Sequence, residues 1–419
     1  MEFIPFIGTR YNPSDVQIEN VTAPPYDVIS DDYRNRLYDR EPHNVIRLEW
    51  NRDPNPYDSA ARYFKEWKRT GILKREGLPA FYVYHQVFKK PDGEQATRTG
   101  VIGRMKLSPY SAKEILPHER THDWPKRDRL ELMEHTHANF SPIFGLVSDS
   151  SFLFDQSLEP ATVHTPLADV DEALPTGDTI RHLLWRLEDT SAMDRILRIV
   201  QPLQVIIADG HHRYETALEF HEKHRELSGS GYIMMYLSNL QSEGTVILPT
   251  HRLLHSIPGF NQYHLLEKLR GRFELVPFTS PEEGMAELER DDAALTLAEF
   301  AEDPKWVLLR DARPHERDFV KPASARLEED ILISMLGLSP KAINERVNLL
   351  YPHTLHELDE LEEERSWDAA FLLRAVRPSE LQAVVQRGEF MPPKTTYFYP
   401  KLLTGLVFHE FEAQMAMPK

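Results

Sequence analysis

The stretch VIIADGHHRYETALEF, residues 205–220, constrains the fold of this chain more than any other. Its apolar run at 205–208 is typical of a strand buried on both faces. Gly210 then permits a tight turn, or the close approach of a ligand to the backbone. Apolar residues recur at helical spacing beyond the glycine. We therefore expect a strand over 204–208, a sharp turn, and a helix that continues to about residue 227.

Three potentially cationic side chains, His211, His212 and Arg213, lie on the first turn of this expected helix. A helix N-terminus already carries partial positive charge and unpaired N–H groups, and it usually begins with acids or hydroxyl side chains. A bound anion, phosphate above all, explains the arrangement, because the N–H groups and the guanidinium both attract it. Asp209 would then hold a hard cation such as Mg²⁺. In the structural alternative, Asp209 caps the helix and the basic residues pair with surface acids.

A second cluster of charged residues, ILPHERTHDWPKRDRL, occupies positions 115–130. Glu119 could serve as a general base there, and Thr121 could donate a hydrogen bond to an anion. Lys126, Arg127 and Arg129 could neutralise the charge of that anion. The alternative is a solvated charged loop, and the sequence favours neither.

Histidine pairs in the same region raise the question of a metal centre. His118 and His122 are four residues apart, and His135 and His137 are two apart. Zinc sites of hydrolases often combine histidine with a carboxylate. No spacing here matches a helix-borne zinc motif, so a metal-dependent hydrolase ranks below the phosphate interpretation.

The charge balance and the absence of cysteine exclude several classes of protein. With 49 basic and 66 acidic residues the formal charge is −17, so broad binding to DNA or RNA is not expected. No cysteine is present, which excludes disulfides, thiolate chemistry and cysteine-bound metals. The first residues lack the pattern of a signal peptide, and no apolar run is long enough to span a bilayer. We expect a cytoplasmic protein without a membrane partner.

Along the chain, helical and strand patterns are mixed. A hairpin is expected around Asp92–Gly93, and LDELEEE is expected to be a solvated helix face. Helices are expected at 56–69, at 129–137 and, as one or two helices, at 178–200. Further strands are expected at 44–50, 231–240, 245–249, 306–311 and 369–376.

Seven motifs together carry a resemblance that runs from near the first residue to near the last. They are TAPPYDVIS, NVIRLEW, ILPHERTHDWPKRDRL, ANFSPIFGL, ADGHHRYETAL, LPTHRLL and MPPKTTYFYPKLLTGLVF. The chain resembles a family of bacterial and archaeal proteins known as a domain of unknown function. Within it, the DGHHR element is similar to the phosphate-binding element of the ParB/sulfiredoxin superfamily. That superfamily includes ParB partition proteins, sulfiredoxin and the free serine kinases.

This resemblance implies an α+β fold with a ParB/sulfiredoxin-like core at 111–260, an N-terminal segment 1–110 and a C-terminal segment 261–419. It implies Glu119 as catalytic base and Asp209 as the catalytic carboxylate on the magnesium side. The residues implied to hold the phosphates are Gly210, His211, His212 and Arg213, with Lys126 and Arg129 as further candidates. We assign His118 and Thr121 to the acceptor. The chain departs from sulfiredoxin by lacking its cysteine, and from ParB by a histidine-rich motif and an acidic net charge.

The function expected from these residues is phosphoryl transfer to the hydroxyl group of a small molecule, with free L-serine giving O-phosphoserine as the first candidate. The donor would be ATP, ADP or pyrophosphate with Mg²⁺, and the oligomeric state is left open, a homodimer being one option. One alternative is a nucleotide-binding ParB-like switch module, which is favoured if Glu119 lies away from the phosphate pocket. The other is a metal-dependent phosphohydrolase, which is favoured if the histidines bind a transition metal.

Overall fold

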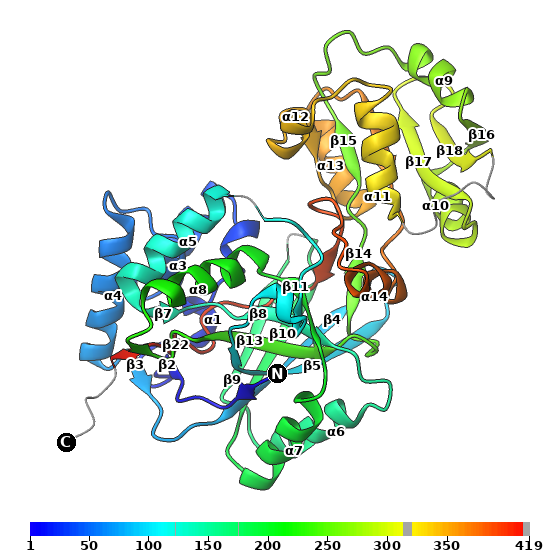
Figure 1. Ribbon diagram of the computed structural model, residues 1–419. Helices are drawn as coiled ribbons and strands as arrows, with labels where there is room; N and C mark the ends of the chain where they lie inside the picture. The colour runs from blue at the N-terminus through cyan, green and yellow to red at the C-terminus, as the bar shows by residue number, and fades with distance from the viewer. Residues whose placement is uncertain (122, 175, 313–320, 414–419) are drawn as a thin grey trace. The chain divides into compact units, whose positions relative to one another are not determined.

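The computed structural model describes residues 1–121, 123–174, 176–312 and 321–413 (Figure 1). The chain forms two compact units, each described here by itself. The first unit comprises Met1–Pro117, Thr121–Val246 and Pro400–Lys419, and the second comprises His118–Arg120 and Ile247–Tyr399. The chain thus leaves the first unit and returns to it near its C-terminus.

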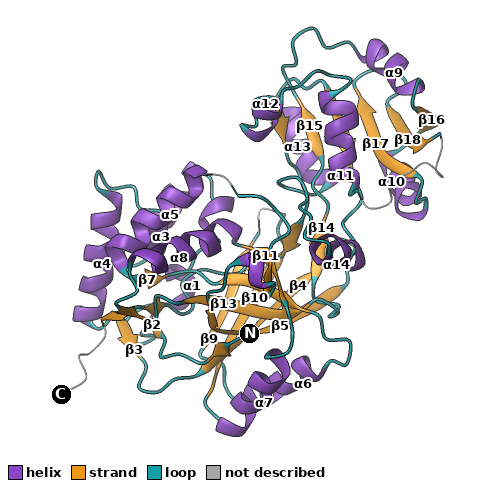
Figure 2. Cartoon of the chain, viewed as in Figure 1, coloured by secondary structure: helices purple, strands orange, loops and turns teal. Residues whose placement is uncertain are grey.

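The first unit is built on one mixed sheet (Figure 2). Its strands, in spatial order, are β6 (Ile115–Leu116), β11 (Val205–Asp209), β8 (Ile143–Val147), β13 (Tyr232–Asn239), β5 (Gln95–Lys106), β4 (Phe81–Lys89), β10 (Thr179–Leu187) and β9 (Ala168–Ala173). β1 (Phe3–Ile4) also pairs with β5. The β11–β6 and β13–β8 pairs are parallel, and the other neighbouring pairs of this sheet are antiparallel.

The helices of the first unit pack against this sheet or against one another. They are α1 (Ile18–Val21), α2 (Asp31–Arg40), α3 (Ile46–Glu49), α4 (Pro56–Thr70), α5 (Asp123–Thr136), α6 (Leu153–Thr162), α7 (Thr190–Val200) and α8 (His211–Lys223), with short 3-10 turns η1 (Tyr26–Val28) and η2 (Tyr110–Ala112). Short strand pairs are β2 (Thr9–Tyr11) with β3 (Leu73–Arg75), β7 (Ala138–Asn139) with β22 (His409–Glu410), and β12 (Leu227–Ser228) with β23 (Glu412–Ala413). One apolar core joins the sheet to α6, α7 and α8, and a second forms around α2, α3 and α4. Figure 1 shows α4, α5 and α8 side by side.

The second unit has an antiparallel sheet with a core on each face. Its strand order is β16 (Phe273–Phe278), β18 (Trp306–Asp311), β17 (Ala294–Phe300), β20 (Ala369–Leu372), β15 (Arg252–Leu254) and β19 (Leu349–Leu350). Leu308 and Leu309 illustrate the alternation, because each belongs to a different apolar cluster. The helices are α9 (Gln262–Arg270), α10 (Pro281–Arg290), α11 (Ala323–Arg326) continued by the π-helical η4 (Leu327–Ile333), α12 (Pro340–Asn344), α13 (Leu355–Glu364) and α14 (Pro378–Gln386). β14 (Val246–Leu248) pairs with β21 (Tyr397–Tyr399).

Several expected elements are confirmed. The hairpin is β4–β5, and Gly93 has the left-handed backbone conformation that its turn requires. The helix expected from residue 56 is α4, which ends at the left-handed Gly71. The strands expected at 231–240, 245–249, 306–311 and 369–376 correspond to β13, β14, β18 and β20. The acidic LDELEEE stretch lies in α13.

Two expected elements are wrong. The strand expected at 44–50 is instead helix α3, and the Asn44 side chain just before it accepts a hydrogen bond from the Ile46 N–H at 3.0 Å, a local contact that competes with strand pairing. The stretch 178–200 was expected to form one or two helices; α7 is one helix, but the first half of the stretch is the strand β10. The burial of β10 alternates at its start, as a half-buried strand requires, and Asp189 then caps α7 by accepting from the Ala192 N–H.

The three expected segments do not coincide with the two units. Strands from 1–110 and from 111–246 share one sheet, since β5 pairs with β13, and the second unit begins at Ile247. The fold is mixed α and β, and the ParB/sulfiredoxin-like core stays a prediction. Within the described residues, no helix combines the length and the hydropathy needed to cross a membrane.

Candidate functional site

The turn between β11 and α8 has the expected form of strand, glycine and helix. β11 ends at Asp209, Gly210 occupies the N-cap position with φ of +97°, and α8 begins at His211. A side chain at Gly210 would place its Cβ atom 3.1 Å from the Nε and Nη2 atoms of Arg213. Glycine is therefore required both by the left-handed backbone and by the guanidinium beside it. Of the two histidines, His211 is buried and His212 is half-buried.

The Asp209 carboxylate lies between two cations. Its Oδ2 atom is 3.7 Å from Arg213 Nη2 and 3.5 Å from Lys401 Nζ. The three side chains are 20%, 13% and 14% exposed, so water and small solutes reach the group. The sequence analysis missed Lys401, whose only signal is a lone lysine within the buried, apolar segment FYPKLL.

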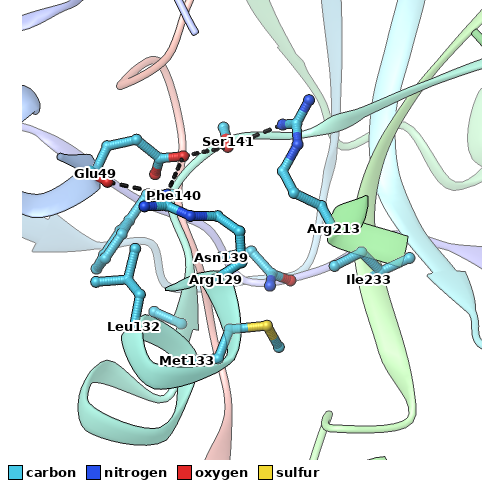
Figure 3. A pocket seen from close by; sticks show the side chains of 10 residues that line it. Glu49, Arg129, Leu132, Met133, Asn139, Phe140, Ser141, Arg213 and Ile233 are labelled. Atoms are coloured by element: carbon cyan, nitrogen blue, oxygen red, sulfur yellow. Dashed lines mark hydrogen bonds and ion pairs between the residues drawn. The ribbon is translucent and has the colours of Figure 1, made fainter. Parts of the chain in front are cut away.

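A buried chain of hydrogen bonds holds Arg213 in place (Figure 3). Arg213 Nη1 donates to Ser141 Oγ and to the Pro142 carbonyl, both at 2.9 Å. Ser141 Oγ donates in turn to Glu49 Oε1 at 2.9 Å, and Arg129 Nη1 donates to the same oxygen at 3.2 Å. A small pocket beside this chain is lined by Glu49, Arg129, Leu132, Met133, Ala138, Asn139, Phe140, Ser141, Arg213 and Ile233.

Arg129, a predicted phosphate-binding residue, lies in this chain with its donors directed at carboxylates. It is 5% exposed, and its Nη2 atom donates to Asp128 Oδ2 at 2.5 Å. Its guanidinium also stacks on the Tyr26 ring, 4.2 Å from the centroid. Arg129 is therefore placed to support Glu49, and through it Ser141 and Arg213.

Two further predicted residues meet on α8. Thr121 Oγ1 donates to Glu215 Oε2 at 2.6 Å, and Lys126 Nζ lies 3.2 Å from the same oxygen. Glu215 was not predicted, although it lies two residues after Arg213 on the same helix. These contacts attach the start of α5 and the residue Thr121 before it to the first turns of α8. His122, one of the candidate metal ligands, lies outside the described residues.

Glu119 and His118 belong to the second unit, whereas Asp209 belongs to the first. Glu119 Oε1 accepts a long hydrogen bond, 3.4 Å, from the Thr395 N–H, and His118 Nε2 lies 2.8 Å from Thr396 Oγ1. Thr395 also lines a small pocket within the second unit, together with Thr250 and Ser324. The role of Glu119 as the base therefore stays a prediction, and the sequence gave no sign that Glu119 belongs to the second unit.

A shared metal site of several protein ligands is not found in the part of the chain that the structure describes. No group of three or more His, Asp or Glu side chains there is arranged to hold one ion. The histidines at 118, 135, 137, 211 and 212 therefore do not form such a group with other described residues.

Comparison with solved structures gives matches of low similarity. A free serine kinase mutant in complex with ADP is 14% identical, with a TM-score of 0.37 over 72% of this chain and 91% of that one. A conserved hypothetical protein from Pyrococcus furiosus is also 14% identical, with a TM-score of 0.34 over 72% and 94%. SbnI with a C-terminal truncation, from Staphylococcus aureus, is 10% identical, with a TM-score of 0.36 over 72% and 85%.

Sequence comparison assigns a family but no characterised relative. No curated protein matches the chain. The model of the family described as "Protein of unknown function (DUF1015)" matches residues 3–330, which is most of the chain. The chain therefore belongs to the DUF1015 family.

Proposed function

We propose that this protein transfers a phosphoryl group from ATP, ADP or pyrophosphate to the hydroxyl group of a small molecule, with free L-serine as the first acceptor to test. The observation that carries the proposal is the β11–α8 turn. There the N-terminus of a 13-residue helix follows a left-handed glycine, and the anchored guanidinium of Arg213 lies beside the Asp209 carboxylate. A helix N-terminus with a fixed guanidinium favours a bound phosphate.

In this proposal the N–H groups at the start of α8, with His211, His212 and Arg213, bind the phosphates of the donor. Asp209 would hold Mg²⁺, which when bound neutralises charge on the phosphate oxygens. Glu119 takes the proton of the acceptor hydroxyl as the new P–O bond forms and the phosphoanhydride bond of the donor breaks, which releases ADP, AMP or phosphate. Its long hydrogen bond to the Thr395 N–H leaves carboxylate lone pairs available for that proton.

The test is a phosphoryl-transfer assay with Mg²⁺, each of the three donors, and serine, threonine and homoserine as acceptors. We expect Glu119→Gln to lower turnover about a hundred- to ten-thousandfold with donor binding nearly unchanged. Asp209→Asn should instead weaken Mg²⁺-dependent donor binding as well as turnover. Glu222→Gln, at an exposed position on the same helix α8, is the control and should behave as wild type.

Three other outcomes would change either the assigned base or the assigned function. Full turnover in Glu119→Gln would show that this carboxylate is not the base. Nucleotide binding without transfer to any acceptor would indicate the switch module. Release of phosphate to water at the same rate with and without an acceptor would indicate a phosphohydrolase.

A further inference from the structure

Residues 400–403 lead the chain back into the first unit, and we call them the return segment. Side chains of the sheet hold this segment in place. Gln86 Nε2, on β4, donates to the Lys401 carbonyl at 2.7 Å, and Arg98, on β5, donates to the Pro400 carbonyl. The Tyr84 hydroxyl accepts a hydrogen bond from the Leu403 N–H at 3.2 Å. Three side chains of the sheet therefore fix the backbone on both sides of Lys401.

These anchors are buried and bonded to one another. Gln86, Arg98 and Tyr84 are each 0% exposed, and Arg98 Nε donates to Gln86 Oε1 at 3.0 Å. Burying an arginine costs free energy. Apolar contacts alone would be enough to pack the return segment against the sheet. A fully bonded polar network of this kind specifies one position of the backbone. It therefore specifies where the Lys401 side chain begins.

That position brings Lys401 to the start of α8. Its ammonium lies 3.5 Å from the Asp209 carboxylate, which also has Arg213 at 3.7 Å. Two cationic side chains thus flank one carboxylate. The N-terminus of α8 adds partial positive charge beside them. Two cations at a helix N-terminus favour a bound anion, in a molecule whose formal charge is −17.

We propose that Lys401 is a further anion-binding residue of this site, which contacts a phosphate of the donor together with Arg213. This inference rests on the proposed function and adds a residue that the family match, residues 3–330, does not reach. A lysine ammonium carries three donors on a flexible stem, so it can turn from the Asp209 carboxylate to a phosphate oxygen. Gln86 and Arg98 are then positioning residues, since they act through the return segment.

The experiment compares binding of pyrophosphate and of ADP, each with Mg²⁺, to the full chain by titration calorimetry. We expect Lys401→Met to weaken both about ten- to a hundredfold, the range for loss of a charge-assisted hydrogen bond. Lys401→Arg should retain most of the affinity. The control is Lys223→Met, which removes a half-exposed lysine at the other end of α8 that is paired with Glu219. Thermal unfolding of each variant shows whether it is folded.

The outcomes separate this inference from the proposed function. Weaker pyrophosphate and ADP binding in Lys401→Met supports the inference even where wild type transfers phosphate to no acceptor. Unchanged binding of both in a folded Lys401→Met overturns the inference, even where wild type is an active kinase. If wild type binds neither pyrophosphate nor ADP, the inference is overturned, and the proposed function then depends on the transfer assay with ATP.

Discussion

Gly210 is the residue at which backbone conformation and ligand chemistry meet. Its φ of +97° costs a residue with a side chain roughly 1–2 kcal/mol, and a Cβ would lie 3.1 Å from the Arg213 guanidinium. We expect Gly210→Ala to lower the free energy of unfolding by about this amount and also to weaken pyrophosphate binding, because the guanidinium must shift. Urea unfolding and calorimetry measure the two effects.

Gly71 provides a matched control, since it is also left-handed, at +86°, but nothing lies within 4 Å of a Cβ placed there. Gly71→Ala should lose similar stability and bind pyrophosphate normally. Equal binding by both variants would contradict the role given to the Arg213 contact.

Single residues of the candidate site differ in how far the sequence reveals them. Asp209 and Arg213 could be predicted because the turn places them within one contiguous motif. Ser141, Glu49 and Lys401 could not, because each reaches the site from a distant part of the chain. Their partners are set by sheet pairing and by the return of the chain, and neither leaves a local pattern.

Helix α8 is held at its first turns by one buried hydroxyl. The Tyr214 hydroxyl donates to the Ser108 carbonyl at 2.8 Å and accepts from the Ser108 N–H at 3.0 Å. Tyr214→Phe leaves these two buried backbone groups unpaired, so we expect a loss of about 1–3 kcal/mol in the free energy of unfolding. Urea unfolding measures it. Tyr263→Phe, on α9, is the control: its side chain is 55% exposed, and a change below about 0.5 kcal/mol is expected. Equal losses in the two variants would refute the anchoring role.

The correctly predicted elements combine a regular spacing of apolar residues with residues that mark where the element ends. α4 has helical spacing and a terminal glycine, and the β4–β5 hairpin has a turn between two strand patterns. α3 and β10 were misassigned because tertiary contacts decide them. Asn44 donates to the Asn20 and Thr22 carbonyls, which fixes the start of α3, and β10 gains its strand form by pairing with β4 and β9.

At the scale of the whole molecule, the sequence contained little about the division into units. No low-complexity linker marks the boundary near Val246, and the first unit is completed by the segment from Pro400 onward. β22 in that segment pairs with β7, so the cores of the first unit need residues from both ends of the chain. Long-range pairing of this kind is a property of the assembled sheet rather than of any window of sequence.

The two units also differ in their buried ionisable groups. In the first unit, burial lowers the pKa of His85 to about 4 and that of His409 to about 3. In the second unit, burial lowers the pKa of His251 to about 3, while burial and then the Glu362 carboxyl raise the pKa of Glu299 to about 8. These shifts act on stability in opposite directions.

Mild acid should therefore destabilise the first unit more than the second. A histidine with a lowered folded pKa binds its proton only after unfolding, so its contribution is present above pH 6.5 and is lost as the pH falls toward the folded pKa. Each such histidine lowers the free energy of unfolding by up to about 1.4 kcal/mol for every unit by which the pH falls in this range, and His85 and His409 both lie in the first unit. Glu299 affects the free energy of unfolding in the opposite direction. Its stabilising contribution is present below pH 4.5 and is lost as the pH rises through about 8. Between pH 6.5 and 4.5 it therefore offsets the destabilisation caused by His251.

Hydrogen exchange read by mass spectrometry at pH 7 and pH 5, corrected for the intrinsic rate, distinguishes the units. We expect the protection of β4 and β13 to fall more than that of β17 and β20 on going to pH 5. His264→Gln, at an exposed position on α9, should leave the pattern unchanged. Glu299→Gln removes one offsetting carboxyl and leaves Glu362, whose pKa burial raises to about 7, so the second unit should then lose more protection at pH 5 than it does in wild type. An equal loss in both units of wild type would show that these buried groups do not govern the acid response.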